Sequence, residues 1–320
     1  MFKLLAIYIS LLTCSPGDRV YEHYGHTSLR VVDTEKRIDW VYNYGVFTFN
    51  TDHFYAKFVK GETYYQLGKQ RTEDFVADFV SEGRTIYEQE LNLNEEQKQW
   101  LINALEENYL PSKRFYLYNF VFDNCATRPY NMIRRAFNYS IESNYKGWEG
   151  ESYRKVLNHY TDPGSWVGFA INMIFGHRAN TAMNGEQRFF LPELLMHGLE
   201  QATTADGTPI IAGPTRNMLT GKEYSPGGAQ FAIPATPWYK TWYFGWFVFV
   251  IVMWFITFLN RLKGQLNIAI DITLGIIYLI PILIATYLTF FSLHPLVGYN
   301  FRLLIFPITH VCIRLLYLRR

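Results

Sequence analysis

The chain has 320 residues, which is enough for one large domain or two smaller ones. Its formal net charge is only +2, so it lacks the strongly basic character of nucleic-acid-binding proteins, and we expect no nucleic-acid partner. Aromatic residues make up 18% of the chain, a share that suits a membrane-associated protein with interfacial Trp and Tyr. The three cysteines, Cys14, Cys125 and Cys312, are too few for a disulfide framework, although a Cys14–Cys125 bridge outside the cytoplasm stays open.

The N-terminus admits two interpretations. Met1-Phe2-Lys3 and the apolar run that follows it resemble an export signal, but no A-x-A cleavage site comes next. Leu11-Leu12-Thr13-Cys14 resembles a lipoprotein box only loosely, because Thr is a poor residue before the cysteine. The alternation up to Leu12 is equally typical of a β-strand, and we favour the strand.

Strand and helix signals then alternate up to about residue 110. Strands are predicted over Thr27–Val32, Ile38–Tyr44, Thr63–Leu67 and Thr85–Leu91. Helices are predicted over Asp52–Val59, over Thr72–Glu82 with Thr72 as the cap, and from the Asn94-Glu95-Glu96-Gln97 capping box to about Asn108. This succession predicts an α+β fold.

The next stretch, Tyr118 to Tyr130, contains a candidate nucleophile. Its aromatic and β-branched start, Tyr118–Phe122, predicts a buried strand or an extended approach, Asp123 and Asn124 are good helix caps, and a helical stripe follows over Thr127–Phe137. Cys125 therefore lies at a helix N-terminus, where free amides and the helix dipole favour a thiolate. It is either a nucleophile or a small buried thiol packed under the helix.

Beyond this stretch the signals weaken until a membrane part begins. Two helices are predicted over Tyr153–Tyr160 and Trp166–Phe175, and Phe189–Leu199 carries a Leu-Pro pair without a clear assignment. A last strand and a linker are predicted over Pro209–Pro214 and Gly221–Pro237. Apolar runs over Trp242–Leu259, Ile268–Phe291 and Phe301–Leu318 predict three transmembrane helices.

The positions of the basic residues predict the orientation of these helices. Arg261 and Lys263 follow the first span, and the pair Arg319-Arg320 ends the chain, so the positive-inside rule places both sites in the cytoplasm. Three spans then leave everything before Trp238 on the outer side, which is the periplasm in a cell with two membranes. We therefore predict an outer domain over residues 1–220, a linker over 221–237 and a membrane domain over 238–320.

A cysteine nucleophile needs a base and a group that orients the base. His26 opens one predicted strand and Asn43 closes the next, so antiparallel pairing would bring the two together, with Asn43 holding the imidazole tautomer. His23 and His53 are rival bases that are more typical of surface residues. We find no metal-ligand spacing among His26, His53 and Cys125.

Three further residues are candidates for contacts with substrate. The hydroxyls of Tyr24 and Tyr118 are candidate oxyanion donors, although aromatic core packing explains them equally well. Arg128 could bind a phosphate bidentately, or it could be a surface or capping arginine.

Five ordered motifs resemble one family: Leu11-Leu12-Thr13-Cys14-Ser15-Pro16-Gly17-Asp18, Tyr24-Gly25-His26-Thr27, Tyr42-Asn43-Tyr44-Gly45, Lys57-Phe58-Val59-Lys60-Gly61 and Phe122-Asp123-Asn124-Cys125-Ala126-Thr127-Arg128. Together they resemble the Lnb N-terminal periplasmic domain over most of residues 5–200. The resemblance implies a circularly permuted papain-like fold, similar to lecithin retinol acyltransferase, in which a histidine precedes an Asn-Cys motif as His26 precedes Asn124-Cys125.

The resemblance also implies a function. Full-length members are inner-membrane lipoprotein N-acyltransferases that move an acyl chain from a phospholipid to the α-amine of an S-diacylglyceryl-cysteine apolipoprotein, without a cofactor. Carried over, Cys125 is the nucleophile and His26 the base, whereas Asn43 as the orienting residue is our inference from strand geometry.

Two other classes of function stay open. The same residues would serve a papain-like cysteine hydrolase, either a peptidoglycan peptidase or amidase or a phospholipase, with water as the final acceptor. The chain could also be a non-enzymatic membrane scaffold, which a wide separation of Cys125 and His26 would support.

Overall fold

The computed structural model describes residues 7–47, 52–225, 231, 233–263 and 268–300. These residues form two compact units, one from residues 1–150 and 183–232 and the other from residues 151–182 and 233–320. Segment 151–182 thus groups with the C-terminal helices, whereas the boundaries expected at residues 220 and 237 stay predictions. The third expected span, Phe301–Leu318, lies outside the described residues.

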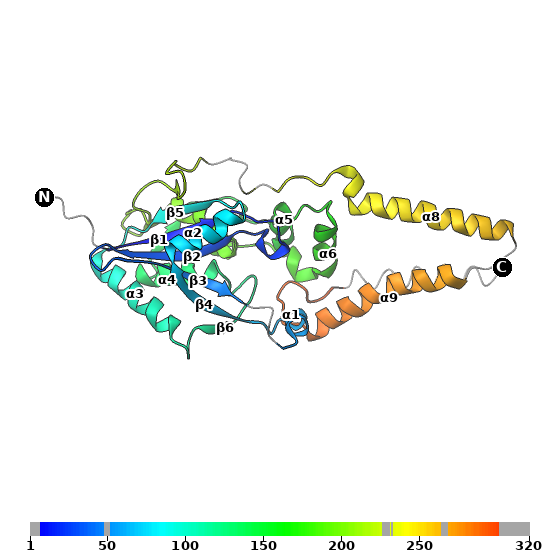
Figure 1. Cartoon of the computed structure of the whole chain (residues 1–320), viewed down its shortest axis with the longest axis horizontal. Helices are drawn as coiled ribbons and strands as arrows, with labels where there is room; N and C mark the ends of the chain where they lie inside the picture. Colours follow the sequence, from blue (N-terminus) through cyan, green and yellow to red (C-terminus); the bar gives the residue numbers. More distant parts are fainter. Residues whose placement is uncertain (1–6, 48–51, 226–230, 232, 264–267, 301–320) are drawn as a thin grey trace. The chain divides into compact units, whose positions relative to one another are not determined.

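In its described part, the first unit is built on a seven-stranded antiparallel sheet (Figure 1). The strands are β1 (Ile7–Cys14), β2 (His26–Asp33), β3 (Ile38–Val46), β4 (Tyr64–Arg71), β5 (Ile86–Glu90), β6 (Phe115–Leu117) and β9 (Arg216–Asn217), in the order β6-β4-β3-β2-β1-β5-β9. The strand interpretation of the N-terminus is confirmed, because β1 pairs with β2 from Ile7↔Asp33 to Cys14↔His26. That register places His26 at the end of the strand pair.

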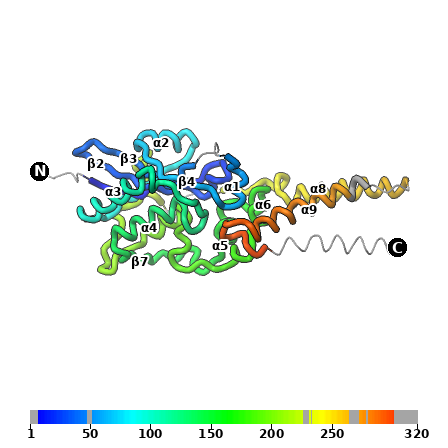
Figure 2. The backbone as a smooth tube through the Cα atoms, turned by 90° about the horizontal axis from the view of Figure 1, so that it is seen from below, coloured from blue at the N-terminus to red at the C-terminus, as the bar shows by residue number. Residues whose placement is uncertain are grey.

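Helices cover both faces of this sheet. On one face, Phe75 of α2 (Thr72–Ser81) packs against Leu12, Val41 and other buried residues of the strands. The other face carries α3 (Glu95–Tyr109) and α4 (Thr127–Ala136), and Asn108 of α3 donates to the Tyr44 hydroxyl at 3.2 Å. Figure 2 shows α2 and α4 on opposite sides of the strands. The predicted α+β layering is therefore confirmed.

Two of the predicted helix caps, Asn94 and Thr72, differ in outcome. Asn94 closes the predicted capping box, since its Oδ1 accepts from the Gln97 amide and Gln97 Oε1 accepts from the Asn94 amide, both at 2.9 Å. Thr72 was expected to cap α2 but is already its first helical residue, and its hydroxyl donates to Asp39 on β3. The Thr72 hydroxyl thus bonds a residue of another element instead of a backbone amide of its own helix.

Two predicted strands are wrong. The run from Tyr118 does not continue the sheet, because Asn119 and Asp123 exchange backbone hydrogen bonds at 3.0 Å and the Asn119 side chain accepts from two amides inside the turn. The last strand was expected over Pro209–Pro214, where two prolines lack the N–H that a ladder needs. Only isolated bridges form there, at Pro209 and Ile211.

Short elements complete the first unit. They are η1 (Val20–Glu22), α1 (Phe54–Lys60), η3 (Gly185–Phe190), α7 (Pro192–Glu200) and the two-stranded sheet of β7 (Ile141–Ser143) and β8 (Ala202–Thr204).

The second unit joins a small helical layer to the apolar helices. Its elements are α5 (Tyr153–His159), α6 (Trp166–Ile174), η2 (His177–Asn180), η5 (Trp238–Lys240), α8 (Trp242–Leu262) and α9 (Ile268–Phe291). Trp242, at the start of α8, stacks on Phe169 of α6 at 4.7 Å, and the amide of Gly176 donates to Leu296, beyond the end of α9. These contacts hold one end of each apolar helix against the same layer.

Among the described residues, two helices are long and apolar enough to cross a membrane, Trp242–Leu262 and Ile272–Phe291. No residue of α8 is buried inside the protein, which distinguishes this helix from a core helix of a soluble protein. Two of the three predicted spans therefore correspond to helices.

Candidate active site

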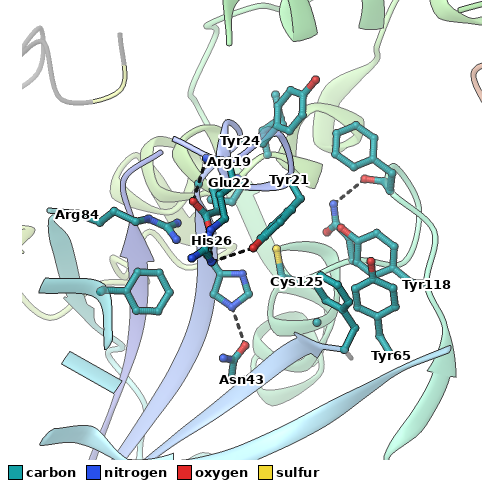
Figure 3. Close-up of a pocket in the computed structure, with 18 of the residues that line it drawn as sticks. Arg19, Tyr21, Glu22, Tyr24, His26, Asn43, Tyr65, Arg84, Tyr118 and Cys125 are labelled. Atoms are coloured by element: carbon teal, nitrogen blue, oxygen red, sulfur yellow. Dashed lines mark hydrogen bonds and ion pairs between the residues drawn. The ribbon is translucent and has the colours of Figure 1, made fainter. Parts of the chain in front are cut away.

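Most of the predicted site residues line one pocket of about 280 Å³ in the first unit (Figure 3). Cys125, His26, Asn43, Tyr24 and Tyr118 all contribute to its wall. The rival bases His23 and His53 and the phosphate candidate Arg128 are not among the residues that line it. Strand pairing and the segment before α4 therefore bring residues from four parts of the chain to one place.

His26 is held by Asn43. The ring Nε2 lies 2.6 Å from Asn43 Oδ1, as the predicted pairing of β2 with β3 requires. Because a carbonyl oxygen only accepts, Nε2 carries the proton in this arrangement and Nδ1 keeps a lone pair. A neutral imidazole with one ring nitrogen fixed and the other basic is suited to general-base chemistry.

Cys125 and His26 lie close to the same point beside Gly45. A Cβ added at Gly45 would lie 3.5 Å from Cys125 Cβ and 3.6 Å from His26 Cε1, so the two side chains flank the same point. Figure 3 shows them directed toward each other across the pocket. Gly45 also has φ +101, a region that residues with a side chain rarely adopt. The wide separation that would have supported a scaffold is therefore not found.

The segment before α4 positions the cysteine. Asn124 is buried, its Oδ1 accepts from the amides of Ala126 and Thr127 at 2.9 Å, and its Nδ2 donates to the Phe190 carbonyl at 2.8 Å. The prediction of a helix N-terminus at this point is thus confirmed, with Cys125 two residues before α4, but the N-cap position is held by Ala126 and not by the expected Asp123 or Asn124.

The expectation of a preformed thiolate is wrong. Burial raises the pKa of Cys125, and although the amides of Thr27 and Cys125 lower it, the result is a pKa of about 11. Burial likewise lowers the pKa of His26 to about 4, against the raising effect of its hydrogen bond to Asn43. The resting pair is therefore a thiol and a neutral imidazole, because burial disfavours both charges more than the helix end compensates.

An aromatic wall surrounds the cysteine. Tyr118 stacks on Tyr65 with ring centroids 4.1 Å apart, and Tyr65 lies 4.9 Å from Phe47. Tyr24 packs edge-on against Phe120 at 4.9 Å. Burial raises the pKa of Tyr65 to about 12 and that of Tyr118 well above its ordinary value, so both remain phenols. Phenol hydroxyls at this wall are compatible with the oxyanion role predicted for Tyr118.

Charged residues that sequence reasoning missed line the other end of the pocket: Arg19, Glu22, Asp78, Glu82 and Arg84. Arg84 is the most buried of the five, and its Nε donates to the Ser15 carbonyl at 2.8 Å. Its guanidinium lies 4.4 Å above the Phe79 ring, and Phe79 stacks in turn beside His26. No local motif marks these residues, since tertiary contacts alone bring them to the site.

The Arg128 side chain is bound by other residues of the protein. Its Nε and Nη2 donate to the two oxygens of Asp123 at 2.6 and 2.7 Å, and its guanidinium lies 3.5 Å above the Tyr116 ring. These contacts explain Arg128 as a residue that holds the turn before Cys125, and we do not carry its phosphate-binding role forward.

The two described cysteines, Cys14 and Cys125, are both free, so the bridge left open by the sequence is not formed. Within the part of the chain that the structure describes, no three His, Cys, Asp or Glu side chains are grouped so that they could hold a metal ion.

The family comparison covers the N-terminal half of the chain. Residues 2–159 match the family model described as the Lnb N-terminal periplasmic domain. No curated protein and no solved structure matches the chain significantly. Together with the two apolar helices, the family match indicates a membrane-anchored protein with a periplasmic domain. Over residues 2–159, this chain therefore belongs to the Lnb N-terminal periplasmic domain family.

Proposed function

We propose that this protein is an inner-membrane apolipoprotein N-acyltransferase with Cys125 as nucleophile, His26 as base and Asn43 as the residue that orients the base. One observation carries the proposal: in a domain of the Lnb family, Cys125 and His26 flank Gly45 in one aromatic pocket, with His26 held by Asn43. The acyl donor is a membrane phospholipid and the acceptor a diacylated apolipoprotein. No cofactor is required, because a thiol and an imidazole suffice for acyl transfer.

We also propose that the domain is a circularly permuted papain-like fold. The histidine strand β2 precedes the helix that follows the cysteine, as the family resemblance implies, and that helix packs on the sheet that bears the base. The buried Asn124 before Cys125 supports the same arrangement, since it holds the segment that presents the thiol.

The first half of the reaction forms a thioester. As Cys125 Sγ attacks the ester carbonyl of the phospholipid, Nδ1 of His26 takes the thiol proton, so that no free thiolate accumulates in the dry pocket. The Cys125 amide, with Tyr24 or Tyr118 as a second donor, stabilises the oxyanion, an interaction worth about 3 kcal/mol. The carbon–oxygen bond then breaks, and the lysophospholipid leaves with the proton from His26.

The second half transfers the acyl chain to nitrogen. The neutral α-amine of the lipoprotein cysteine attacks the thioester, His26 accepts a proton from the amine, and that proton returns to Sγ as the carbon–sulfur bond breaks. A thioester is close in energy to the original ester, whereas the amide product is more stable. The overall transfer therefore runs toward the N-acylated lipoprotein, and membrane anchoring brings the domain to two substrates that both reside in a bilayer.

The decisive experiment is mass spectrometry of lipoprotein N-termini from cells that lack other N-acyltransferases and carry either the wild-type protein or Cys125→Ser. We expect an amide-linked acyl chain with the wild type and its complete loss in the variant. Cys14→Ser is the matched control, because it changes the other described cysteine, which lies outside the pocket. Unmodified lipoproteins with a well-expressed wild type would overturn the proposal.

A cysteine hydrolase is the second candidate, and the charged end of the pocket favours it. Arg19, Glu22 and Arg84 are side chains that a polar substrate could contact. In a hydrolase, water would then hydrolyse the same Cys125 thioester. Purified protein incubated with phospholipid separates the two functions. Release of free fatty acid that is unaffected by an added diacylated lipopeptide indicates a hydrolase, whereas acyl transfer to the lipopeptide amine indicates the transferase.

A further inference from the structure

The short helix α1 presents apolar side chains to solvent. At about 100° per residue, Phe54, Phe58, Tyr55 and Val59 fall within an arc of about 140° on its circumference. Phe54 is buried, but Tyr55 is 77% exposed, Phe58 47% and Val59 39%. Large apolar side chains gathered on one exposed face are typical of a surface that contacts a partner or a membrane.

The opposite side of α1 carries two lysines. Lys57 and Lys60 lie outside the apolar arc, no acidic residue lies between Phe54 and Lys60, and Lys60 Nζ pairs with Glu62, just beyond the helix, at 2.7 Å. An aromatic apolar face flanked by lysines is the pattern of helices that lie in the interface of an anionic bilayer, with rings among the acyl chains and ammonium groups at the phosphates. A protein partner would require no such division of charge.

A continuous set of aromatic rings leads from this face to the pocket. Phe58 stacks on Phe54 at 6.1 Å, Phe54 stacks on Phe47 at 6.0 Å, and Phe47 lies 4.9 Å from Tyr65. Phe47 and Tyr65 line the pocket that holds Cys125. The exposed face of α1 and the pocket of Cys125 are therefore connected by a row of contacting aromatic rings.

We propose that α1 is an interfacial docking helix. Its exposed face inserts into the outer leaflet of an anionic bilayer, and the acyl chain of a bound phospholipid passes along Phe54 and Phe47 to Cys125. The docking itself is independent of catalysis, whereas the acyl-chain route rests on the proposed transferase function. If these side chains were only scattered surface aromatics, they would show no preference for lipid. If this face bound a protein partner instead, it would stay in water when this chain is the only protein in the bilayer.

The test places an environment-sensitive fluorescent amino acid at Tyr55 of the full-length protein in vesicles of phosphatidylethanolamine and phosphatidylglycerol. The matched control places it at Tyr139, another tyrosine of the same unit that is 62% exposed and lies just beyond α4. We expect lipids brominated on their acyl chains to quench the probe at position 55, and aqueous iodide to quench the probe at position 139. Equal iodide quenching at the two positions would overturn the docking proposal, whatever the protein catalyses.

A kinetic arm tests the route. In the double variant Tyr55→Ser/Phe58→Ser we expect acyl transfer from bilayer phospholipid to fall about tenfold, the effect of losing partial burial of two aromatic side chains, while thioester formation from a water-soluble short-chain ester is unchanged. Tyr139→Ser should affect neither reaction. Equal losses with both donors would show that α1 supports folding of the pocket rather than access from the membrane.

Discussion

Two histidines of the same unit show how their surroundings assign different chemistry to one residue type. His26 opens β2 in the pocket and faces the neutral amide of Asn43, and burial together with the Arg84 charge holds its pKa at about 4. His197 lies on α7 between Glu193 and Glu200, with ring–carboxylate distances of 3.7 and 3.4 Å. Burial lowers the pKa of His197, but its hydrogen bonds to the two carboxylates outweigh that effect and raise it to about 9.

The difference teaches which partner makes a buried histidine a base. A neutral amide fixes the ring and its tautomer and raises the His26 pKa less than burial lowers it, so His26 keeps a free lone pair at neutral pH. Two carboxylates keep His197 protonated, and a protonated ring can stabilise an ion pair but cannot accept a proton. The site of His26 therefore suits catalysis, and that of His197 suits structure.

The largest effect is expected from removing the base. His26→Gln keeps a hydrogen-bonding side chain of similar reach beside Asn43 but lacks a proton acceptor of useful basicity, so acyl transfer should fall by about 10³-fold. The rate of thioester formation measures the effect directly. Unchanged thermal unfolding of the variant is the control for folding, and activity within a few-fold of the wild type would remove His26 from the mechanism.

A carboxylate partner for His26 should make its pKa resemble that of His197. In the wild type, activity is lost only as the pH falls through the His26 pKa, so the acid limb of kcat/KM lies near pH 4. Asn43→Asp places a negative charge beside the His26 ring, which should raise the pKa of His26 and so move the acid limb to higher pH, as the two carboxylates raise the pKa of His197. The full pH profile of kcat/KM is the measurement.

Asn43→Ala is the control for that experiment. It removes the orienting group without adding charge, so it should lower kcat/KM across the whole pH range. The acid limb should stay below pH 6.5, the ordinary pKa of a histidine. A wild-type limb near pH 6.5, or no difference between the aspartate and alanine variants, would contradict the assignment of a neutral His26.

The smallest effect is expected at the structural histidine. His197→Gln should leave kcat/KM unchanged and lower the free energy of unfolding by about 1–3 kcal/mol, the range for hydrogen bonds to charged groups. Because the folded-state pKa is raised, this contribution is complete below pH 6.5 and is lost as the pH rises through about 9. The difference in unfolding midpoint between wild type and variant should therefore shrink toward zero as the pH rises from 6.5 to about 9. A difference that does not depend on pH would exclude the ion pair as its cause.

Features with a local cause were predictable from the sequence. The strand that ends at Cys14 follows from alternation, and the start of α3 follows from Asn94 and Gln97, which satisfy each other within one turn. Cys125 before α4 and the apolar length of α8 are equally local properties. The pairing of His26 with Asn43 was also within reach, because antiparallel neighbours follow from a short hairpin loop.

Other features depended on contacts between distant segments. Thr72 bonded Asp39 instead of capping its own helix, and Arg128 bonded Asp123 instead of remaining available for a phosphate. Arg84 reached the pocket only because β5 pairs with β1, which no pattern around Gly83 indicates. In each case a partner in another part of the fold decided the role of the side chain.

By itself, the sequence determined the order of the elements, the candidate nucleophile, its candidate base and the apolar helices, since each of these follows from short-range periodicity, capping or residue type. Only the tertiary structure decided the protonation state of the pair. A helix N-terminus favours a thiolate locally, but the depth at which Cys125 and His26 are buried depends on packing against segments up to Phe190 and Pro192, and loss of water around both groups outweighs the helix end.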